Sequence, residues 1–244
     1  MSLRAFFHLH AGLAREAPGD DEATLTALRR LGPLPPDPRV LDLGCGPGRA
    51  SLLLARELHT PVEAIDLHAP FLEELTRTAA AADLSIRTRH ADFGALTDPP
   101  ASVDLVWSEG AIYHLGFEPG LRLWRPLLRP RGRIAVTELT WRSPPDERPA
   151  EAVAFWRDAY PAMTSVSANL AAAASAGFTV IDHLPLPARA WTNYYDPLLA
   201  RAEDLAPTAD PELADAIAET RREADLWRRH GHSYDYVFYL MRAR

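Results

Sequence analysis

The sequence predicts an open α/β fold, with a seven-stranded, mostly parallel sheet, helices on both faces and a helical insert before the last strand. From residue 39 onward, short apolar segments alternate with helical ones, which is the pattern of strands joined by crossover helices. The strand segments are apolar almost throughout, as expected where helices cover both faces of a sheet. The chain has 244 residues, of which 47% are hydrophobic, and this is enough for one large core.

Each expected strand is a short apolar segment bounded by turn residues. The seven strands are expected at residues 39–43, 62–66, around Ile86, and at 103–108, 133–139, 178–184 and 234–241. Helical spacing of leucine and alanine predicts the helices between them. The first helix is expected from Asp20 or Asp21 to Leu31, and the second directly after the glycine-rich turn at 44–48. The others are expected at 69–82, 119–128, 149–160 and 165–176, and in a charged insert at 194–230.

The composition excludes several kinds of chemistry. All 26 basic side chains are arginine, so neither a Schiff-base lysine nor the phosphate-binding lysine of a Walker loop is available. The net charge of -7 disfavours nucleic acid as a partner, because its binders carry a basic face. One cysteine, Cys45, allows neither a disulfide framework nor a cysteine-based zinc site.

Membrane and metal partners are also not expected. No apolar run approaches the roughly 18 residues that a membrane-spanning helix needs. His8 and His10 interrupt the apolar N-terminal segment, which argues against a secretory signal. These two histidines alternate as in a strand, as do His230 and His232, but neither pair has a third ligand nearby, so no metal site is expected. We therefore expect a cytoplasmic protein, either a monomer or a homodimer.

The most informative segment is VLDLGCGPGRAS, at residues 40–51. It places Gly44, Gly46 and Gly48 between a strand and a helix, where glycine lets the backbone turn tightly and approach a ligand. The helix N-terminus behind the turn favours polar or anionic ligand atoms. The third glycine comes one residue too early for the G-x-G-x-x-G loop that binds dinucleotides, so NAD is disfavoured.

The spacing D-x-G-x-G-x-G, which begins at Asp42, resembles the first motif of the class I S-adenosylmethionine-dependent methyltransferases, which have a Rossmann-like fold. The resemblance covers roughly residues 36–140, and the expected order of strands also agrees with that family. Together with FFHLHAGLAREAPG and SYDYVFYLMRAR near the two ends, it indicates a bacterial subgroup that acts on small molecules. It implies S-adenosylmethionine as the cofactor, with its methionine part lined by Asp42, Gly44, Cys45, Gly46 and Gly48.

Two further motifs follow at the places that the resemblance predicts. Asp66 ends the second strand, where a carboxylate can accept hydrogen bonds from two ribose hydroxyls, and Leu67 would pack on the adenine. Asp92 and Phe93 follow the third strand, and the resemblance implies that both contact the adenine. The alternatives are a helix N-cap for Asp66, a turn cap for Asp92 and a core position for Phe93.

Residues at the carboxyl end of the fourth strand are expected at the ligand, because open α/β sheets bind ligands at that edge. Ser108 and Glu109 are expected beside the cofactor, and Tyr113 and His114 beside the methyl acceptor. Methyl transfer is an in-line displacement, and a base is needed only where the acceptor arrives protonated. We expect His114, with an ordinary pKa near neutrality, and Glu109 to be catalytic, although Glu109 is also suited to face the ammonium of the cofactor and His114 to pack at a helix end.

Further candidates for the acceptor site lie later in the chain. Glu138 and Trp141 end the fifth strand, and the rings of Trp141 and Tyr113 could shield a sulfonium by cation–π contact. Tyr194 and Tyr195 open the helical insert, where such a pair either covers the acceptor or packs in the core.

We expect one domain over residues 1–244. Residues 1–35 form an N-terminal arm and a helix, residues 36–140 the cofactor-binding core, and residues 141–244 a C-terminal part with a helical lid at about 187–232. The arm, which carries Phe6, Phe7, His8, His10 and Arg15, could close the same cleft.

The expected function is transfer of a methyl group from S-adenosylmethionine to oxygen or nitrogen of a small-molecule acceptor. Two alternatives stay open. One is a non-catalytic cofactor-binding subunit that supports a partner enzyme. The other is a methyltransferase acting on RNA or protein, which the negative charge disfavours.

Overall fold

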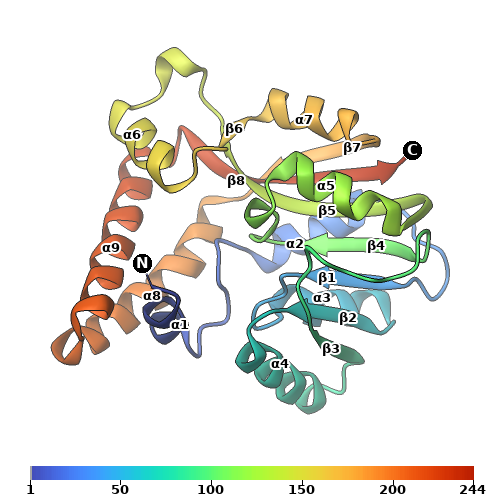
Figure 1. Cartoon of the computed structure of the whole chain (residues 1–244), viewed down its shortest axis with the longest axis horizontal. Coiled ribbons are helices and arrows are strands. Elements are labelled where there is room, and N and C mark those ends of the chain that lie inside the picture. Colours follow the sequence, from blue (N-terminus) through green and yellow to red (C-terminus); the bar gives the residue numbers. More distant parts are fainter. Residues whose placement is uncertain (1) are drawn as a thin grey trace.

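The fold is built on one twisted sheet. The computed structural model describes residues 2–244, and residue 1 of the N-terminal arm lies outside them. Seven strands follow one another in the order β3-β2-β1-β4-β5-β8-β7 (Figure 1). The first five are parallel, and β8 runs antiparallel to both of its neighbours. The predicted α/β fold with a mostly parallel sheet is therefore confirmed.

The strands lie close to their predicted positions, and the main difference concerns the fifth. The fifth strand begins earlier than predicted, because its first residues are rich in arginine and do not read as an apolar run. A further short strand, β6, pairs with its end. Two residues leave no periodic pattern, so the sequence could not predict β6. The strands are β1 (Val40–Leu43), β2 (Val62–Asp66), β3 (Ile86–His90), β4 (Val103–Ser108), β5 (Leu128–Trp141), β6 (Thr164–Ser165), β7 (Phe178–Pro185) and β8 (Tyr234–Ala243).

Helices cover both faces of the sheet. The N-terminal arm, for which no helix was predicted before Asp20, contains one that the hydroxyl of Ser2 caps. The charged insert divides into two helices because Pro207 and Pro211 interrupt it. The α-helices are α1 (Leu3–His10), α2 (Asp21–Arg30), α3 (Arg49–Leu58), α4 (Ala69–Ala81), α5 (Phe117–Trp124), α6 (Ala150–Ala159), α7 (Val166–Ser175), α8 (Ala188–Leu205) and α9 (Pro211–His230).

Each face of the sheet buries its own apolar cluster. On one face, Trp124 of α5 packs in a cluster with Val136 of β5 and residues of α7. On the other face, Leu54 of α3 packs with Leu105 of β4 and residues of α2. Burial of these side chains holds the strands in register and fixes where each strand ends.

The helices α8 and α9 stand beside the sheet, with α1 against them (Figure 1). Leu9 of α1 is fully buried and packs with Leu198 of α8 and Ile217 of α9. His8 and His10 therefore lie on a helix, and the expectation of a strand-like alternation is wrong. No helix within residues 2–244 is long and apolar enough to cross a membrane. The same residues contain no group of three His, Cys, Asp or Glu side chains able to hold a metal ion.

Candidate functional site

A cavity of about 820 Å³ opens at the carboxyl ends of β1, β2 and β4. Its volume is typical of a site for a small molecule or cofactor. In the sheet, β1 lies between β2 on one side and β4 on the other, so the strand order reverses at this point. Open α/β sheets form their ligand-binding crevice where the strand order reverses. Its walls are the turn after β1, the ends of β2 and β4, the segment 110–115 and an N-terminal segment.

The glycine-rich turn after β1 forms the floor of this cavity. Gly44 has a φ of 70°, and a Cβ added to it would lie 2.4 Å from the Cβ of Ala111 and 3.3 Å from the ring of Phe93. A side chain at this position would therefore clash with the wall opposite. The cavity is also lined by Cys45 and Gly46.

Gly48 has a packing role at the start of α3. It precedes α3 with a φ of 87°, and an added Cβ would lie 2.2 Å from a methyl group of Leu75. This glycine therefore lets α4 pack against the start of α3; it is not among the residues that line the cavity, and its contact with the cofactor stays a prediction.

Asp42 lies beneath the turn and borders the cavity. Its carboxylate accepts a hydrogen bond of 2.5 Å from the hydroxyl of Ser51. Burial, together with the smaller effect of the nearby carboxylates of Glu109 and Asp66, raises the pKa of Asp42 to about 7. A positively charged ligand would stabilise the ionised form of this buried carboxyl group.

Asp66 is held at the end of β2 by two backbone amides. One carboxylate oxygen accepts from the amide of Gly46 at 2.9 Å, and the other from the amide of His68 at 2.8 Å. A carboxylate offers about four lone pairs, so each oxygen can accept one more bond from a ligand. Asp66 and its neighbour Leu67 both border the cavity, and Leu67 is 58% exposed. Asp66 makes no hydrogen bond to the first turn of α4, which begins after His68.

The segment after β3 supplies another wall. Asp92 and Phe93 border the cavity. The carboxylate of Asp92 accepts the amide of Gly94 at 2.7 Å, and the carbonyl of Phe93 accepts the indole N–H of Trp124 at 2.9 Å. These bonds fix an acidic group and an aromatic ring side by side.

Ser108 and Glu109, at the end of β4, lie on opposite sides of the backbone. Ser108 is fully buried, and its hydroxyl donates to the carbonyl of Leu43 at 2.8 Å. This bond ties β4 to β1, and the expected place of Ser108 beside the cofactor stays a prediction. Glu109 borders the cavity, and one of its oxygens accepts from Thr24 and from Trp107, both at 2.8 Å. Burial raises the pKa of Glu109, so it too would be stabilised by a cation.

Tyr113 and His114 border the cavity together, with ring centroids 4.0 Å apart. Burial lowers the pKa of His114, which leaves its imidazole neutral at pH 7 and able to accept a proton. Burial also raises the pKa of Tyr113 to about 12, so its hydroxyl stays protonated.

The four later candidates do not line the cavity. Trp141 is buried, and the guanidinium of Arg148 lies 4.8 Å from its ring centroid, so this ring has a cation–π partner within the protein and its contact with the cofactor stays a prediction. Tyr195 is 2% exposed and packs in the core, which is one of the two alternatives expected for the tyrosine pair. Tyr194 lies beside it, at 5.1 Å between ring centroids. Glu138 is buried as well.

Glu138 has an unusual environment for a carboxyl group. It accepts a hydrogen bond of 2.6 Å from the hydroxyl of Tyr160, and burial raises its pKa from 4.5 to about 8. Between pH 4.5 and about 8, Glu138 keeps its proton in the folded chain and loses it in the unfolded chain. Its contribution to the free energy of unfolding is therefore complete below pH 4.5 and is lost as the pH rises to about 8.

Glu138→Gln should therefore flatten the dependence of stability on pH. The wild-type protein should lose on the order of a few kcal/mol of unfolding free energy relative to this variant between about pH 5 and 9. Urea unfolding of both proteins across this range measures the difference. Parallel profiles for the two proteins would contradict the assignment of the shift to Glu138.

The N-terminal segment covers the cavity. We call residues 3–18 the N-terminal strap; its cavity-lining side chains are those of Leu3, Phe6, Phe7, Ala14, Arg15, Glu16, Ala17 and Pro18. The sequence indicated such a role for Phe6, Phe7 and Arg15 but not for residues 16–18. The predicted helical lid at 187–232 does not itself line the cavity, and instead holds the strap.

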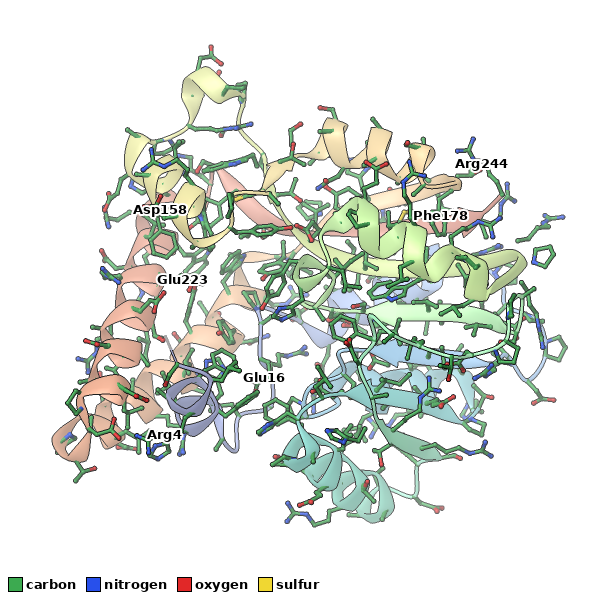
Figure 2. All side chains as sticks on the ribbon, viewed as in Figure 1. Arg4, Glu16, Asp158, Phe178, Glu223 and Arg244 are labelled. Atoms are coloured by element: carbon green, nitrogen blue, oxygen red, sulfur yellow. The ribbon has the colours of Figure 1, made fainter. Side chains whose placement is uncertain are left out.

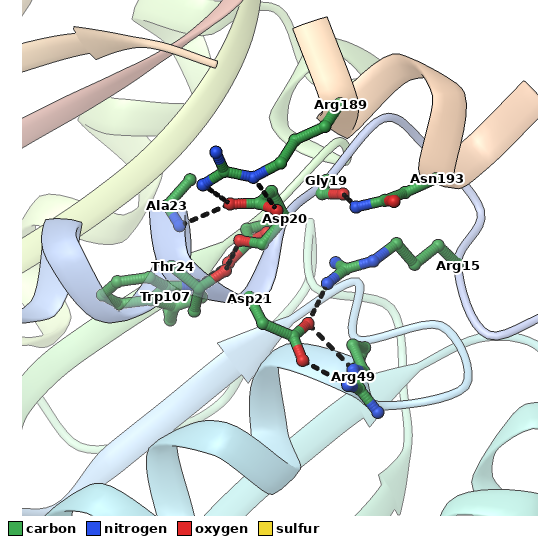
Figure 3. A network of polar contacts seen from close by, with 11 residues as sticks. Arg15, Gly19, Asp20, Asp21, Ala23, Thr24, Arg49, Trp107, Arg189 and Asn193 are labelled. Atoms are coloured by element: carbon green, nitrogen blue, oxygen red, sulfur yellow. Dashed lines mark hydrogen bonds and ion pairs between the residues drawn. The ribbon is translucent and has the colours of Figure 1, made fainter. Parts of the chain in front are cut away.

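Polar contacts hold the strap in two places, and Figure 3 shows those at its C-terminal end. Arg15 at the far end pairs with Asp21, which also binds Arg49 at the start of α3. Next to it, Arg189 of α8 binds both carboxylate oxygens of Asp20, at 2.7 Å each. Asp20 in turn caps α2, so α2, α3 and α8 converge on this point.

In the middle of the strap, Arg201 of α8 donates to the carbonyls of Leu9 and His8, at 2.9 and 3.0 Å. Arg201→Ala should loosen α1 and weaken cofactor binding by about 1 kcal/mol, or about fivefold. Calorimetric titration with S-adenosylhomocysteine measures this loss. Arg222→Ala, which removes an exposed arginine of α9, is the matched control, and an equal effect of both substitutions would show that the contact to α1 is irrelevant.

The known proteins and the family model that this chain resembles are all methyltransferases. Residues 40–132 match the family model of the methyltransferase domain. Dimethylglycine N-methyltransferase of Parasynechococcus marenigrum (strain WH8102) is 38% identical over 129 residues, which are 48% of this chain and 46% of that protein. The 27-O-demethylrifamycin SV methyltransferase of Amycolatopsis mediterranei (strain S699) is 32% identical over 122 residues, 48% of this chain and 45% of that protein. The chain thus spans about half the length of these relatives.

The same fold occurs in a solved structure. The S-adenosylmethionine-dependent methyltransferase from Geobacter sulfurreducens, in complex with S-adenosyl-L-homocysteine, matches with a TM-score of 0.83 and 24% identity. The match covers 100% of this chain and 99% of that one, so the likeness extends to the whole fold. The resemblance inferred from the glycine-rich turn is confirmed.

Proposed function

We propose that the chain transfers a methyl group from S-adenosylmethionine to a small-molecule acceptor; its residues 40–132 match the methyltransferase domain. When bound, this cofactor supplies a methyl group on a sulfonium, which leaves readily to a nucleophile. The observation that carries the proposal is the cavity of about 820 Å³, in which an open glycine turn meets Asp66 and Glu109. An acceptor at oxygen or nitrogen agrees with the names of both relatives.

The residues of the cavity fit the cofactor group by group. The free lone pairs of Asp66 suit the two hydroxyls of a ribose. Leu67, Asp92 and Phe93 provide an apolar wall and an acceptor for the adenine and its amino group. The buried carboxylate of Glu109 suits an ammonium, and the turn at Gly44 leaves room for the methionine backbone. With the pKa values of Asp42 and Glu109 raised by burial, a cationic cofactor would relieve both.

His114 and Tyr113 occupy the side of the cavity that faces the acceptor. The neutral imidazole of His114 is suited to take a proton from an acceptor that arrives protonated. The N-terminal strap excludes water from the cavity and aligns the reacting groups, which supplies much of the rate in a displacement of this type. All these groups belong to one domain that includes the whole chain.

A screen of small-molecule acceptors by mass spectrometry tests the proposal. The protein is incubated with S-adenosylmethionine, and products heavier by one methylene group are sought together with S-adenosylhomocysteine. We expect product from oxygen or nitrogen nucleophiles. Tight cofactor binding with no product from any small molecule would favour the non-catalytic subunit, and methylation of RNA or protein alone would favour the other alternative.

A further inference from the structure

The C-terminal part of the strap contacts two walls of the cavity. A Cβ added to Gly46 would lie 3.2 Å from Cγ of Glu16, and one added to Gly110 would lie 2.4 Å from the Cβ of Ala17. Figure 2 labels Glu16 between α1 and the strands of the sheet. Arg15 directly precedes these two strap residues and also borders the cavity. The strap therefore brings Arg15 to the glycine-rich turn and to the end of β4.

Acidic side chains outnumber basic ones along the cavity. Within residues 2–244, the arginines that border it are Arg15 and Arg49. Burial lowers the pKa of His68 and of His114, which also border it, so both imidazoles are neutral at pH 7. A carboxylate of a bound ligand can therefore pair only with one of the two arginines. The acidic side chains that border the cavity are Glu16, Asp42, Asp66, Asp92 and Glu109.

The two arginines differ in the number of donors that they keep free. Both pair with Asp21 (Figure 3). Arg49 uses Nε, at 2.9 Å, and Nη2 for this pair, and its side chain is 47% exposed. Arg15 uses Nη2 alone, and its side chain is 12% exposed. A guanidinium has five N–H groups, and Nε and Nη1 of Arg15 have no hydrogen-bond partner in the described part of the chain, so they can donate to a ligand.

Two positive charges share one negative charge at this point. Among residues 2–244, Asp21 is the carboxylate bonded to both Arg15 and Arg49, while the neighbouring Asp20 is bound by Arg189. One further carboxylate would balance the two guanidinium groups. A guanidinium binds a carboxylate through two parallel N–H bonds, for which Arg15 still has the donors.

The amino-acid end of the cofactor carries two opposite charges next to each other. Its ammonium suits the buried carboxylate of Glu109. Burial raises the pKa of Glu109, and the positive charge of Arg15 offsets part of this rise, so the two side chains lie within electrostatic reach of each other. Arg15 is thus on the side of Glu109 where the carboxylate of the same amino-acid group needs a cation.

We propose that Arg15 binds the α-carboxylate of the methionine part of the cofactor, and that this bond holds the strap over the bound cofactor. The inference rests on the proposed function. It adds a binding residue from outside the matched domain, since Arg15 precedes residue 40. A ligand without the carboxylate should bind more weakly and leave the strap less firmly held.

Calorimetry with two ligands tests the proposal without turnover. S-adenosylhomocysteine is compared with its decarboxylated analogue, which keeps the adenosine, the sulfur and the amine. We expect the wild-type protein to bind S-adenosylhomocysteine about tenfold more tightly, or better. Arg15→Ala should remove most of this preference by weakening S-adenosylhomocysteine alone. Arg15→Lys keeps the charge without the paired donors and should retain part of the preference.

Arg189→Ala is the matched control, because Arg189 binds Asp20 beside the strap but does not line the cavity. It should change the affinities of both ligands by the same factor. Hydrogen exchange gives a second measurement on the strap itself. The amides of residues 11–17 should exchange more slowly with S-adenosylhomocysteine than with the analogue, and this difference should vanish in Arg15→Ala.

Equal affinities of the wild-type protein for the two ligands would overturn the proposal, and so would equally slow exchange with both. Equal losses for both ligands in Arg15→Ala would also overturn it, because they would show a structural role alone. If Arg15→Ala fails to fold, the wild-type comparison and Arg15→Lys decide. Binding of neither ligand to the folded wild-type protein would instead contradict the proposed function, so the two failures are distinguishable.

Discussion

Gly44→Ala should weaken the binding of S-adenosylhomocysteine by at least about 3 kcal/mol, or about 100-fold. The position has a φ of 70°, and the added Cβ would lie 2.4 Å from the Cβ of Ala111. A left-handed conformation costs a non-glycine residue roughly 1–2 kcal/mol, and the clash adds to this cost by pushing the turn into the cavity. Calorimetric titration measures the affinity, and thermal unfolding measures the loss of stability.

Gly32→Ala is the matched control for this substitution. Gly32 has a φ of 80°, but an added Cβ would meet no atom within 4 Å. It should therefore show the cost of the backbone conformation alone, with unchanged cofactor affinity. If Gly44→Ala bound the ligand as well as Gly32→Ala does, the turn would not form the floor of the cofactor site.

Asp66→Ala should weaken the same ligand by about 1–3 kcal/mol, or about 5–150-fold. Its carboxylate is held by the amides of Gly46 and His68 and keeps lone pairs for two ribose hydroxyls. The substitution removes both ligand bonds and leaves two amides of the loop without their acceptor. Titration with S-adenosylhomocysteine and with its 2′-deoxy analogue separates these effects.

The loss caused by Asp66→Ala should be smaller for the 2′-deoxy analogue, because that ligand lacks one hydroxyl. Asp66→Asn keeps an acceptor oxygen for one backbone amide and should fall between the wild type and Asp66→Ala. The same loss for both ligands would mean that Asp66 only shapes the loop and does not contact the ribose.

Much of the fold was predictable because local and overall patterns agree. The apolar runs at β1 and β4 are buried on both faces, so composition alone marks them. The turn at Gly44 and the acidic group at Asp66 were predictable for a similar reason. The left-handed backbone at Gly44 favours glycine, and the place of Asp66 at a strand end favours an acidic residue. Both residue types can be read from the sequence.

The acceptor side was less predictable, because distant segments build it. Nothing local distinguishes Trp141, which packs in the core, from Tyr113, which borders the cavity. Which aromatic side chain faces a ligand depends on where α8 and α9 dock, and these helices turn their rings toward the core. The position of Glu16 likewise follows from the packing of α1 against α8 and α9, a contact between residues nearly two hundred positions apart.

The central claim is that the cavity at the ends of β1, β2 and β4 binds S-adenosylmethionine. Calorimetric titration of the wild-type protein with S-adenosylhomocysteine tests it most directly. We predict saturable binding of one molecule per chain in the micromolar range, lost or strongly weakened in Gly44→Ala. No binding heat at millimolar ligand, from protein shown to be folded, would contradict the claim.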